Sequence, residues 1–181
     1  MLHSFRFPRL ALLPVLLGSL LTAATIPAAR AVPPSEPPGV SPWTKLPDLP
    51  LGRGGAASAW LGERFVVAGG SYWRSESKHW TDRVDAFDPA TGRWESLPAL
   101  PAPLSDPGYA SDGKALFVVG GNAEGKPLAS AWKLTGNEKT GWWWERLPDL
   151  PRPRTYGAAA VAKGSLYFFA GCDDPANLRS A

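Results

Sequence analysis

The sequence has few of the side chains that commonly bind metals or form disulfides. It contains one cysteine, Cys172, and two histidines, of which His79 is the only one after Val32. A lone cysteine forms no disulfide within its own chain, so core packing must hold the fold. One histidine and one cysteine far apart in sequence cannot form a Cys/His zinc cluster, and a copper site with two histidines is excluded as well. We therefore expect no metal and no other cofactor.

The sequence also lacks a charge excess once its N-terminal segment is set aside. Residues 1–31 have a basic start, an apolar run over 10–21 that is short for a bilayer, and the small-x-small site Ala29-Arg30-Ala31. This pattern predicts a secretory signal peptide, cleaved near Ala31, and a secreted or periplasmic protein. The segment carries three of the 19 basic residues and none of the 16 acidic ones, so the remainder is balanced. A balanced chain gives no support for nucleic acid or a membrane anchor as a partner.

No stretch after the signal peptide has the apolar period of a helix. The chain contains 20 prolines and 19 glycines, which interrupt every window long enough for one. Short alternating or β-branched runs bounded by turn residues are present instead, which predicts an all-β fold. Residues 32–42 are rich in proline and show no apolar periodicity, so we interpret them as a leader.

One apolar run that ends in glycine is repeated along the chain. It occurs at 65–70, 117–121 and 168–172, and the second-glycine position recurs every 51 residues. Trp43, Trp94 and Trp144 lie 27 or 28 residues upstream of these positions, each followed three residues later by Leu-Pro. Such a match predicts one supersecondary unit repeated, with the three tryptophans in the core. The glycines are expected to allow a sharp turn under a packed tryptophan.

The repeat divides the remainder of the chain into a strand over 43–50, units over 51–101 and 102–151, and half a unit over 152–181. Each full unit has four predicted strands, with a polar loop over 71–81 in the first unit and a long turn over 135–141 in the second. The predicted strands cover residues 54–60, 64–68, 83–88, 93–97, 107–111, 115–119, 130–134, 142–147, 156–161 and 165–170.

These units resemble kelch repeats, the four-stranded blades of one class of β-propeller. The likeness rests on the Gly-Gly pair after the second strand, an aromatic-rich third strand, a tryptophan in the fourth, and Leu-Pro-x-Leu-Pro before an arginine. It covers residues 43 to about 174. Cys172 replaces the second glycine, and Leu104 replaces the arginine found at Arg53 and Arg154. The resemblance implies a kelch-type propeller that is incomplete, with two full blades, a leading strand and half a blade.

A narrower likeness is to exported bacterial mutarotases that act on N-acetylneuraminate. It is carried by three stretches: Gly69 to Trp73 with Lys78 to Asp82, Gly120 to Asn122 with Pro127 to Ser130, and Leu150 to Ala158. It implies a central pocket in which an acid and a base interconvert the anomers of a sialic acid without metal or nucleotide. The alternative is a secreted kelch module that binds carbohydrate or protein without chemistry. No catalytic residue is transferred by the resemblance, so the catalytic groups stay unknown.

The candidate ligand-binding residues come from two places in the repeat. Arg53 and Arg154 precede inner strands, where a guanidinium would bind a sugar carboxylate, or would instead tie neighbouring blades together. Tyr156 and Tyr109 are placed at equivalent inner-strand positions, where they would line the channel or simply pack.

The loop over 71–81 supplies Trp73 and His79, and its aromatic and polar side chains suit a sugar. Glu76 and His79 are the nearby titratable pair suited to acid–base work, although nothing in the sequence says that they meet.

The partial units have two explanations. The sequence is a truncated form of a longer propeller, or other copies of the chain complete its blades. Unpaired strands at 43–50 and 165–170 would expose edges that favour self-association.

Overall fold

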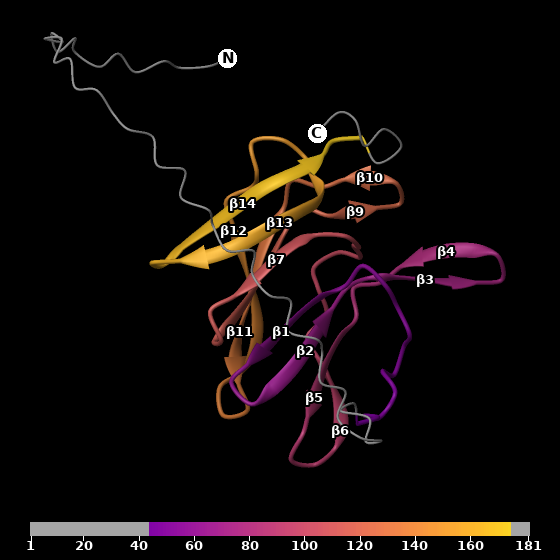
Figure 1. The fold of residues 1–181 in the computed structure, drawn as a ribbon, viewed down its shortest axis with the longest axis vertical. Coiled ribbons are helices and arrows are strands. Elements are labelled where there is room, and N and C mark those ends of the chain that lie inside the picture. Colours follow the sequence, from indigo (N-terminus) through magenta and orange to yellow (C-terminus); the bar gives the residue numbers. More distant parts are fainter. Residues whose placement is uncertain (1–43, 175–181) are drawn as a thin grey trace, which may run out of the picture. The chain divides into compact units, whose positions relative to one another are not determined.

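The computed structural model describes residues 44–174, and all of its regular structure in that range is β-strand (Figure 1). The all-β prediction is therefore confirmed. The predicted signal peptide 1–31 and leader 32–42 lie outside the described residues. Within residues 44–174 there is no helix of the length and apolar character needed to cross a membrane.

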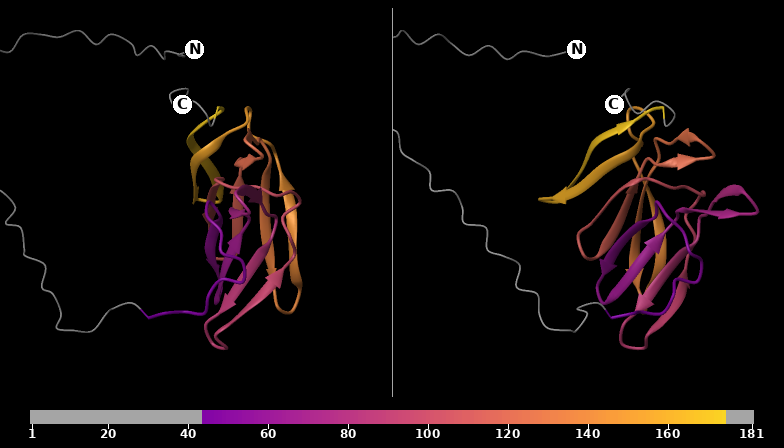
Figure 2. Two further views of the ribbon diagram at one scale, coloured as in Figure 1. Left: turned by 90° about the vertical axis from the view of Figure 1, so that its right-hand side faces the viewer. Right: turned by 45° about the vertical axis from the view of Figure 1, so that its right-hand side comes forward.

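Two antiparallel four-stranded sheets and one hairpin form the repeats. Blade 1 has the strand order β1-β2-β5-β6, blade 2 the order β7-β8-β11-β12 read from its inner strand, and β13 pairs with β14. Residues Ala57 and Ala68 pair in blade 1, and Gly108 and Val119 pair 51 residues later. Figures 1 and 2 show the two blades side by side. The strands are β1 (Ala57–Leu61), β2 (Arg64–Ala68), β5 (Val84–Asp88), β6 (Arg93–Leu97), β7 (Gly108–Ser111), β8 (Ala115–Val119), β11 (Ala131–Asn137), β12 (Gly141–Leu147), β13 (Thr155–Ala162) and β14 (Ser165–Cys172).

The main core lies between the two blades. Successive side chains of a strand point to opposite faces of its sheet, so each blade turns one set of side chains toward the other blade. Leu104, from the linker between the blades, is 1% exposed and joins this core, with Trp142 and Trp144 packed against it. The strand residues of this cluster are Ala57, Leu61, Val66, Ala68, Val84, Ala86, Leu116, Val118 and Leu134.

Outer-strand tryptophans tie each blade to the segment before it. The Nε1 of Trp94 donates to the carbonyl of Pro47 at 3.1 Å, and that of Trp144 donates to the carbonyl of Pro98 at 3.0 Å. Both rings are partly buried. The predicted strand over 43–50 is wrong for its described residues, since 44–50 are in no sheet. Pro47 and Pro50 lack the N–H groups that a paired strand donates, yet the segment keeps its place in the repeat.

The glycine pairs make room for backbone rather than for tryptophan. Gly69 and Gly70 have φ values of 67° and 108°, and the N–H of Gly70 donates to the carbonyl of Leu104 at 2.7 Å. A Cβ on Gly70 would lie 2.9 Å from the carbonyl oxygen of Gly54. The expected freedom of φ is thus present, but the neighbour that needs the space is the backbone of the adjoining segments.

Two small hairpins were not expected. The polar loop over 71–81 contains β3 (Ser71–Arg74) and β4 (Ser77–Trp80), and blade 2 has β9 (Asn122–Ala123) and β10 (Lys126–Pro127). The β3–β4 turn uses Ser75 and Glu76 with φ values of 47° and 64°. A left-handed turn without glycine or asparagine gives no sequence signal, which is why this hairpin was interpreted as a loop. In blade 2 the long turn is also shorter than predicted, because β11 continues to Asn137.

The third hairpin keeps the repeat, with Ala170 and Gly171 in place of the glycine pair. Arg154 to Gly171 is as long as Arg53 to Gly70, and Ala170 and Gly171 take φ values of 56° and 80°. Cys172 pairs with Thr155 as Ser71 pairs with Gly54, so the prediction that Cys172 replaces the second glycine is wrong. Phe168 lies against the inner strand of blade 2, whereas Tyr167 and Phe169 are exposed, at 45% and 54%. Within residues 44–174 the strand β14 pairs only with β13, so self-association through its edge stays a prediction.

Candidate functional site

One end of the blades carries most of the predicted site residues. At this end the inner strands β1, β7 and β13 begin. The segments that follow the second strands β2, β8 and β14 leave the sheets at the same end. Isolated bridges join the two sets of segments at Gly54 with Ser71, Ser105 with Asn122, and Leu128 with Arg154. We call this end the loop face; it comprises residues 53–56, 71–82, 98–107, 122–130 and 154–156.

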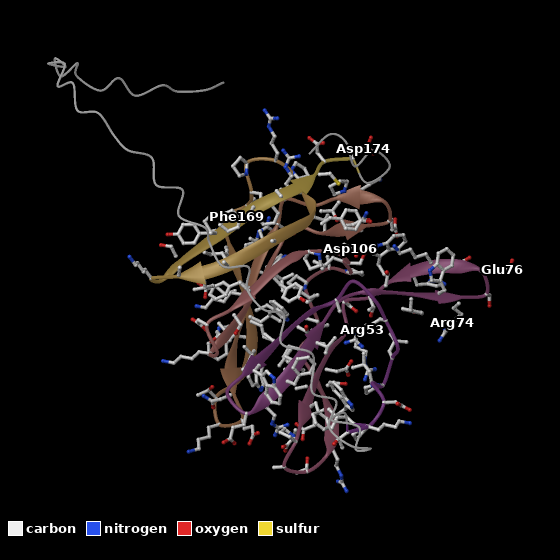
Figure 3. All side chains as sticks on the ribbon, in the orientation of Figure 1. Arg53, Arg74, Glu76, Asp106, Phe169 and Asp174 are labelled. Atoms are coloured by element: carbon white, nitrogen blue, oxygen red, sulfur yellow. The ribbon has the colours of Figure 1, made fainter. Side chains whose placement is uncertain are left out.

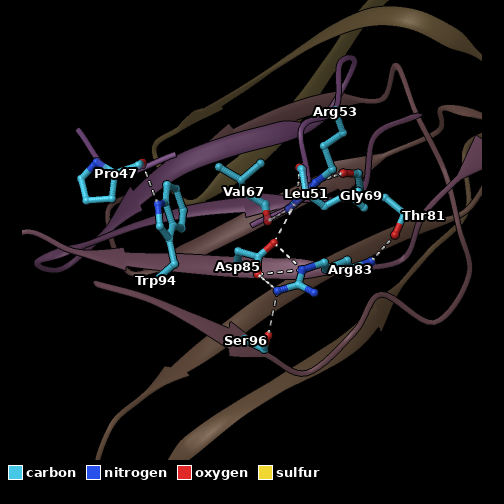
Figure 4. A network of polar contacts seen from close by, with 10 residues as sticks. All are labelled: Pro47, Leu51, Arg53, Val67, Gly69, Thr81, Arg83, Asp85, Trp94 and Ser96. Atoms are coloured by element: carbon cyan, nitrogen blue, oxygen red, sulfur yellow. Dashed lines mark hydrogen bonds and ion pairs between the residues drawn. The ribbon is translucent and has the colours of Figure 1, made fainter. Parts of the chain in front are cut away.

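Arg53 is buried in the network shown in Figure 4. Its Nη1 lies 2.9 Å from Oδ2 of Asp85, and both side chains are 0% exposed. The same guanidinium donates to the carbonyls of Leu51, Val67 and Gly69 at 3.1, 3.1 and 2.7 Å. Burial lowers the pKa of Arg53, and the hydrogen bond to Asp85 opposes that shift. This placement leaves Arg53 inaccessible to a ligand carboxylate and fits the alternative, a structural tie.

Asp85 binds a second arginine. Nη2 of Arg83 lies 2.7 Å from Oδ1 of Asp85, and the bond to Asp85 raises the pKa of Arg83. Arg154, the repeat partner of Arg53, differs from it because its side chain is 25% exposed and its Nη1 lies 3.1 Å from Oδ2 of Asp173. Arg154 is therefore near the surface but already pairs with a carboxylate.

The β3–β4 hairpin extends beyond the sheets (Figures 1 and 2). Register places Trp73, Lys78 and Trp80 on one of its faces, and Tyr72, Arg74 and His79 on the other. The ammonium of Lys78 lies 5.1 Å from the Trp80 ring centre, and the guanidinium of Arg74 lies 5.9 Å from that of Tyr72. Each face therefore combines an aromatic ring with a cation.

Two of the predicted residues are on this hairpin. Trp73 is 71% exposed. His79 stacks on Tyr72, with ring centres 5.3 Å apart. Among the described residues no hydrogen bond or ion pair joins His79 to Glu76, which sits in the turn. The hypothesis that these two form an acid–base pair gains no support from this arrangement.

A groove of about 490 Å³ runs between the hairpin and blade 2. One wall is formed by β4, another by the linker between the blades, and the third by the β9–β10 turn. Its lining residues are Lys78, His79, Trp80, Ala102, Pro103, Ala123 and Glu124.

Three residues at the start of consecutive inner strands form a row that we call the inner rim: Gly55, Asp106 and Tyr156. All three have left-handed backbone, with φ values of 64°, 55° and 57°. The N–H of Asp106 donates to the carbonyl of Gly55 at 2.7 Å, and the N–H of Tyr156 donates to that of Asp106 at 3.0 Å. A bulky residue such as tyrosine rarely takes this conformation, which costs about 1–3 kcal/mol. Strain of this kind is concentrated at functional sites in proteins.

The Asp106 carboxylate lies directly against Gly55 in the inner rim. A Cβ on Gly55 would collide with the Asp106 carboxylate, whose Oδ2 accepts a hydrogen bond from Ser105 Oγ at 2.7 Å. Burial, followed by the negative charge of Asp106, raises the pKa of Tyr156. Tyr156 is half exposed as a residue, and its phenol therefore stays neutral and able to donate.

Asp106 was missed by sequence reasoning, and the equivalence of Tyr109 with Tyr156 was wrong. Asp106 and Tyr156 each lie two residues after a repeat position, Leu104 and Arg154, whereas Tyr109 lies within β7. Counting from the repeat position, rather than matching residue types, would have found Asp106. Within residues 44–174 no cluster of three or more histidine, cysteine, aspartate or glutamate side chains is arranged to hold a metal.

Residues 52–101 match a family described as Kelch motif. The chain is similar to Kelch-like protein terF of Aspergillus terreus, with 28% identity over 139 residues, covering 74% of this chain and 30% of the relative. Beta-scruin of Limulus polyphemus is 25% identical over 140 residues, which cover 73% of this chain and 14% of the relative. The human kelch repeat and BTB domain-containing protein 13 is 28% identical over 127 residues, which cover 69% of this chain and 27% of the relative. The chain thus spans less than a third of the length of each of these proteins.

Proposed function

We propose that this chain, a kelch-repeat protein by its blades and its motif at 52–101, is a protein-interaction module whose contact surface is the loop face. The observation that carries the proposal is the β3–β4 hairpin. It extends from blade 1 and presents Trp73, which is 71% exposed, beside Lys78 on one face, and Arg74 beside Tyr72 on the other. Tryptophan, tyrosine and arginine are the residues that most often dominate the binding energy of protein interfaces.

The groove beside the hairpin supports the same proposal. Its walls come from two blades, and it is lined by aromatic, apolar and charged side chains. An extended peptide segment would place side chains in the groove while the hairpin contacts its flank. Lys78 and Glu124 line the groove with opposite charges, so the groove itself disfavours neither positively nor negatively charged peptides.

The test is an amide chemical-shift titration of the isotope-labelled chain. The probes are four short unstructured peptides, rich in lysine, in glutamate, in tryptophan and leucine, or in glycine and serine. We expect at least one peptide to shift resonances in 71–80, 98–104 and 122–127 saturably. The change Trp73→Ala should weaken that peptide at least tenfold, as expected for a central anchor. The matched control is Trp143→Ala, on β12 and 48% exposed, which should leave affinity unchanged. Equal losses in the two variants, or no shifts with any peptide, would exclude the loop face.

A second candidate is sialic acid mutarotation outside the cytoplasm, after export by the predicted signal peptide. The observation that favours it is the inner rim, where the Asp106 carboxylate and the neutral Tyr156 phenol offer a base and an acid. The test is the approach of freshly dissolved N-acetylneuraminate to anomeric equilibrium, followed by proton NMR. Acceleration that disappears in Asp106→Asn would support this candidate, and no acceleration at high protein concentration would exclude it.

A further inference from the structure

The Asp106 carboxylate is an acidic group without a cationic partner among the described residues. Within residues 44–174 no lysine, arginine or histidine lies at ion-pair distance from it, and its one side-chain hydrogen bond comes from Ser105. Asp85 in the same repeats binds two arginines, and Asp88 lies 3.5 Å from Arg64. Asp106 is only partly buried, so its negative charge is presented to whatever binds the loop face.

The neighbours of this carboxylate suit a cation better than an anion. Tyr156 follows Asp106 in the inner rim and exposes half of its surface, so its ring is available to a bound side chain. Gly55, on the other side, has no side chain to cover the carboxylate. A carboxylate beside an aromatic ring stabilises an ammonium or guanidinium group through charge and through the ring face. The same carboxylate repels an anionic ligand.

We propose that the inner rim binds a lysine or arginine side chain of the protein partner. The cationic group lies against Asp106, and the methylene groups of the side chain lie along Tyr156. This inference rests on the proposed interaction role and adds the chemistry of one contact. It also accounts for the left-handed backbone of Tyr156. Strain at an exposed position is retained where function requires the side chain to be held in a fixed place.

The experiment uses model compounds that differ in one group. The isotope-labelled chain is titrated with the N-acetyl methylamides of lysine, arginine and norleucine, and separately with N-acetylneuraminate. We expect saturable shifts at Gly55, Asp106 and Tyr156 with the two cationic compounds, and at least fivefold weaker binding of norleucine. Raising the salt concentration should weaken the cationic compounds only.

Asp106→Asn is the decisive variant, because asparagine tolerates left-handed backbone and keeps an acceptor for Ser105. It should remove the difference between lysine and norleucine. The control Glu138→Gln makes the same change of charge in the β11–β12 turn, at the opposite end of the blades beside Arg64, and should leave that difference intact. In Tyr156→Asn, binding should weaken while the midpoint of urea unfolding stays the same or rises, since the strained residue is replaced by one that accepts its φ.

Several outcomes would overturn the inference. They are equal shifts from lysine and norleucine, a lysine preference that survives Asp106→Asn, or binding of N-acetylneuraminate in place of the cations. If peptides bind at the hairpin while the lysine compound does not bind the rim, only this inference fails. If no peptide binds the loop face, the proposed interaction role itself fails.

Discussion

Replacing Arg53 with methionine should destabilise the fold strongly. Methionine has a similar length but no charge and no donors. The change would remove the 2.9 Å ion pair with Asp85 and leave the carbonyls of Leu51, Val67 and Gly69 without their guanidinium donors. Because the Arg53 side chain is 0% exposed, water does not reach these groups in the folded state.

The expected loss in the free energy of unfolding depends on the contacts that Asp85 keeps. Removing one partner of a buried ion pair costs about 3–5 kcal/mol. Arg83 still contacts Asp85, so the carboxylate keeps one cation, and we expect a loss of about 3 kcal/mol. With a urea dependence of about 1–3 kcal/mol per molar, the unfolding midpoint should fall by roughly 1–3 M.

The assay is urea unfolding followed by circular dichroism and tryptophan fluorescence. Arg146→Met is the control, because the Arg146–Asp149 pair is 56% and 47% exposed, and it should cost less than about 1 kcal/mol. Blade 2 has Leu104, 1% exposed, at the position of Arg53, so an apolar side chain fits the repeat once no buried carboxylate faces it. A cost for Arg53→Met equal to that of Arg146→Met would refute the structural role and return Arg53 to the ligand-binding candidates.

The remaining predictions concern the ties between blades and the inner rim. Trp144→Phe removes the 3.0 Å hydrogen bond to Pro98 and should cost about 1 kcal/mol in urea unfolding, whereas Trp143→Phe, on the other face of β12, should cost less than half of that. Gly120→Ala should cost more than Gly113→Ala by calorimetry: both have positive φ, but only at Gly120 does a Cβ collide with the Arg154 carbonyl. Ultraviolet titration of Asp106→Asn should show the pKa of Tyr156 moving down toward its ordinary value, because the carboxylate that helps to raise it is gone. In the unmodified chain the Tyr156 phenol ionises in the unfolded state at its ordinary pKa, before it ionises in the folded state. Its contribution to stability is therefore complete below the ordinary pKa and is lost as pH rises through the folded pKa.

The repeat made most of the fold predictable from sequence. Strands β2 and β8 begin and end where they were predicted, because a β-branched run that stops at a glycine pair leaves little freedom in register. The β3–β4 hairpin was not predictable, since its turn relies on Ser75 and Glu76 in left-handed backbone rather than on glycine. Local turn geometry of this kind is decided by the contacts between the two strands.

The site was less predictable because its residues are related by register and not by type. Arg53 and Arg154 hold the same repeat position, yet only Arg53 is buried, since pairing of Val67 with Asp85 places a carboxylate beside it. In blade 2 the same repeat position is held by Leu104. The strand pair that corresponds to Val67 with Asp85 is there Val118 with Trp132, which offers no charge. Asp106, labelled in Figure 3, owes its candidate role to the backbone hydrogen bonds that join it to Gly55 and Tyr156, which residue type does not predict.

The most direct test of the interaction role is site-specific photo-crosslinking. A benzophenone side chain is placed at Trp73 on the hairpin or, in a second sample, at Trp143 on β12, and each sample is irradiated with the tightest-binding peptide of the titration. The loop-face account predicts a saturable crosslink from the position of Trp73, competed by unlabelled peptide, and none above background from that of Trp143. Crosslinking from both positions to the same extent, or from Trp143 alone, would contradict it.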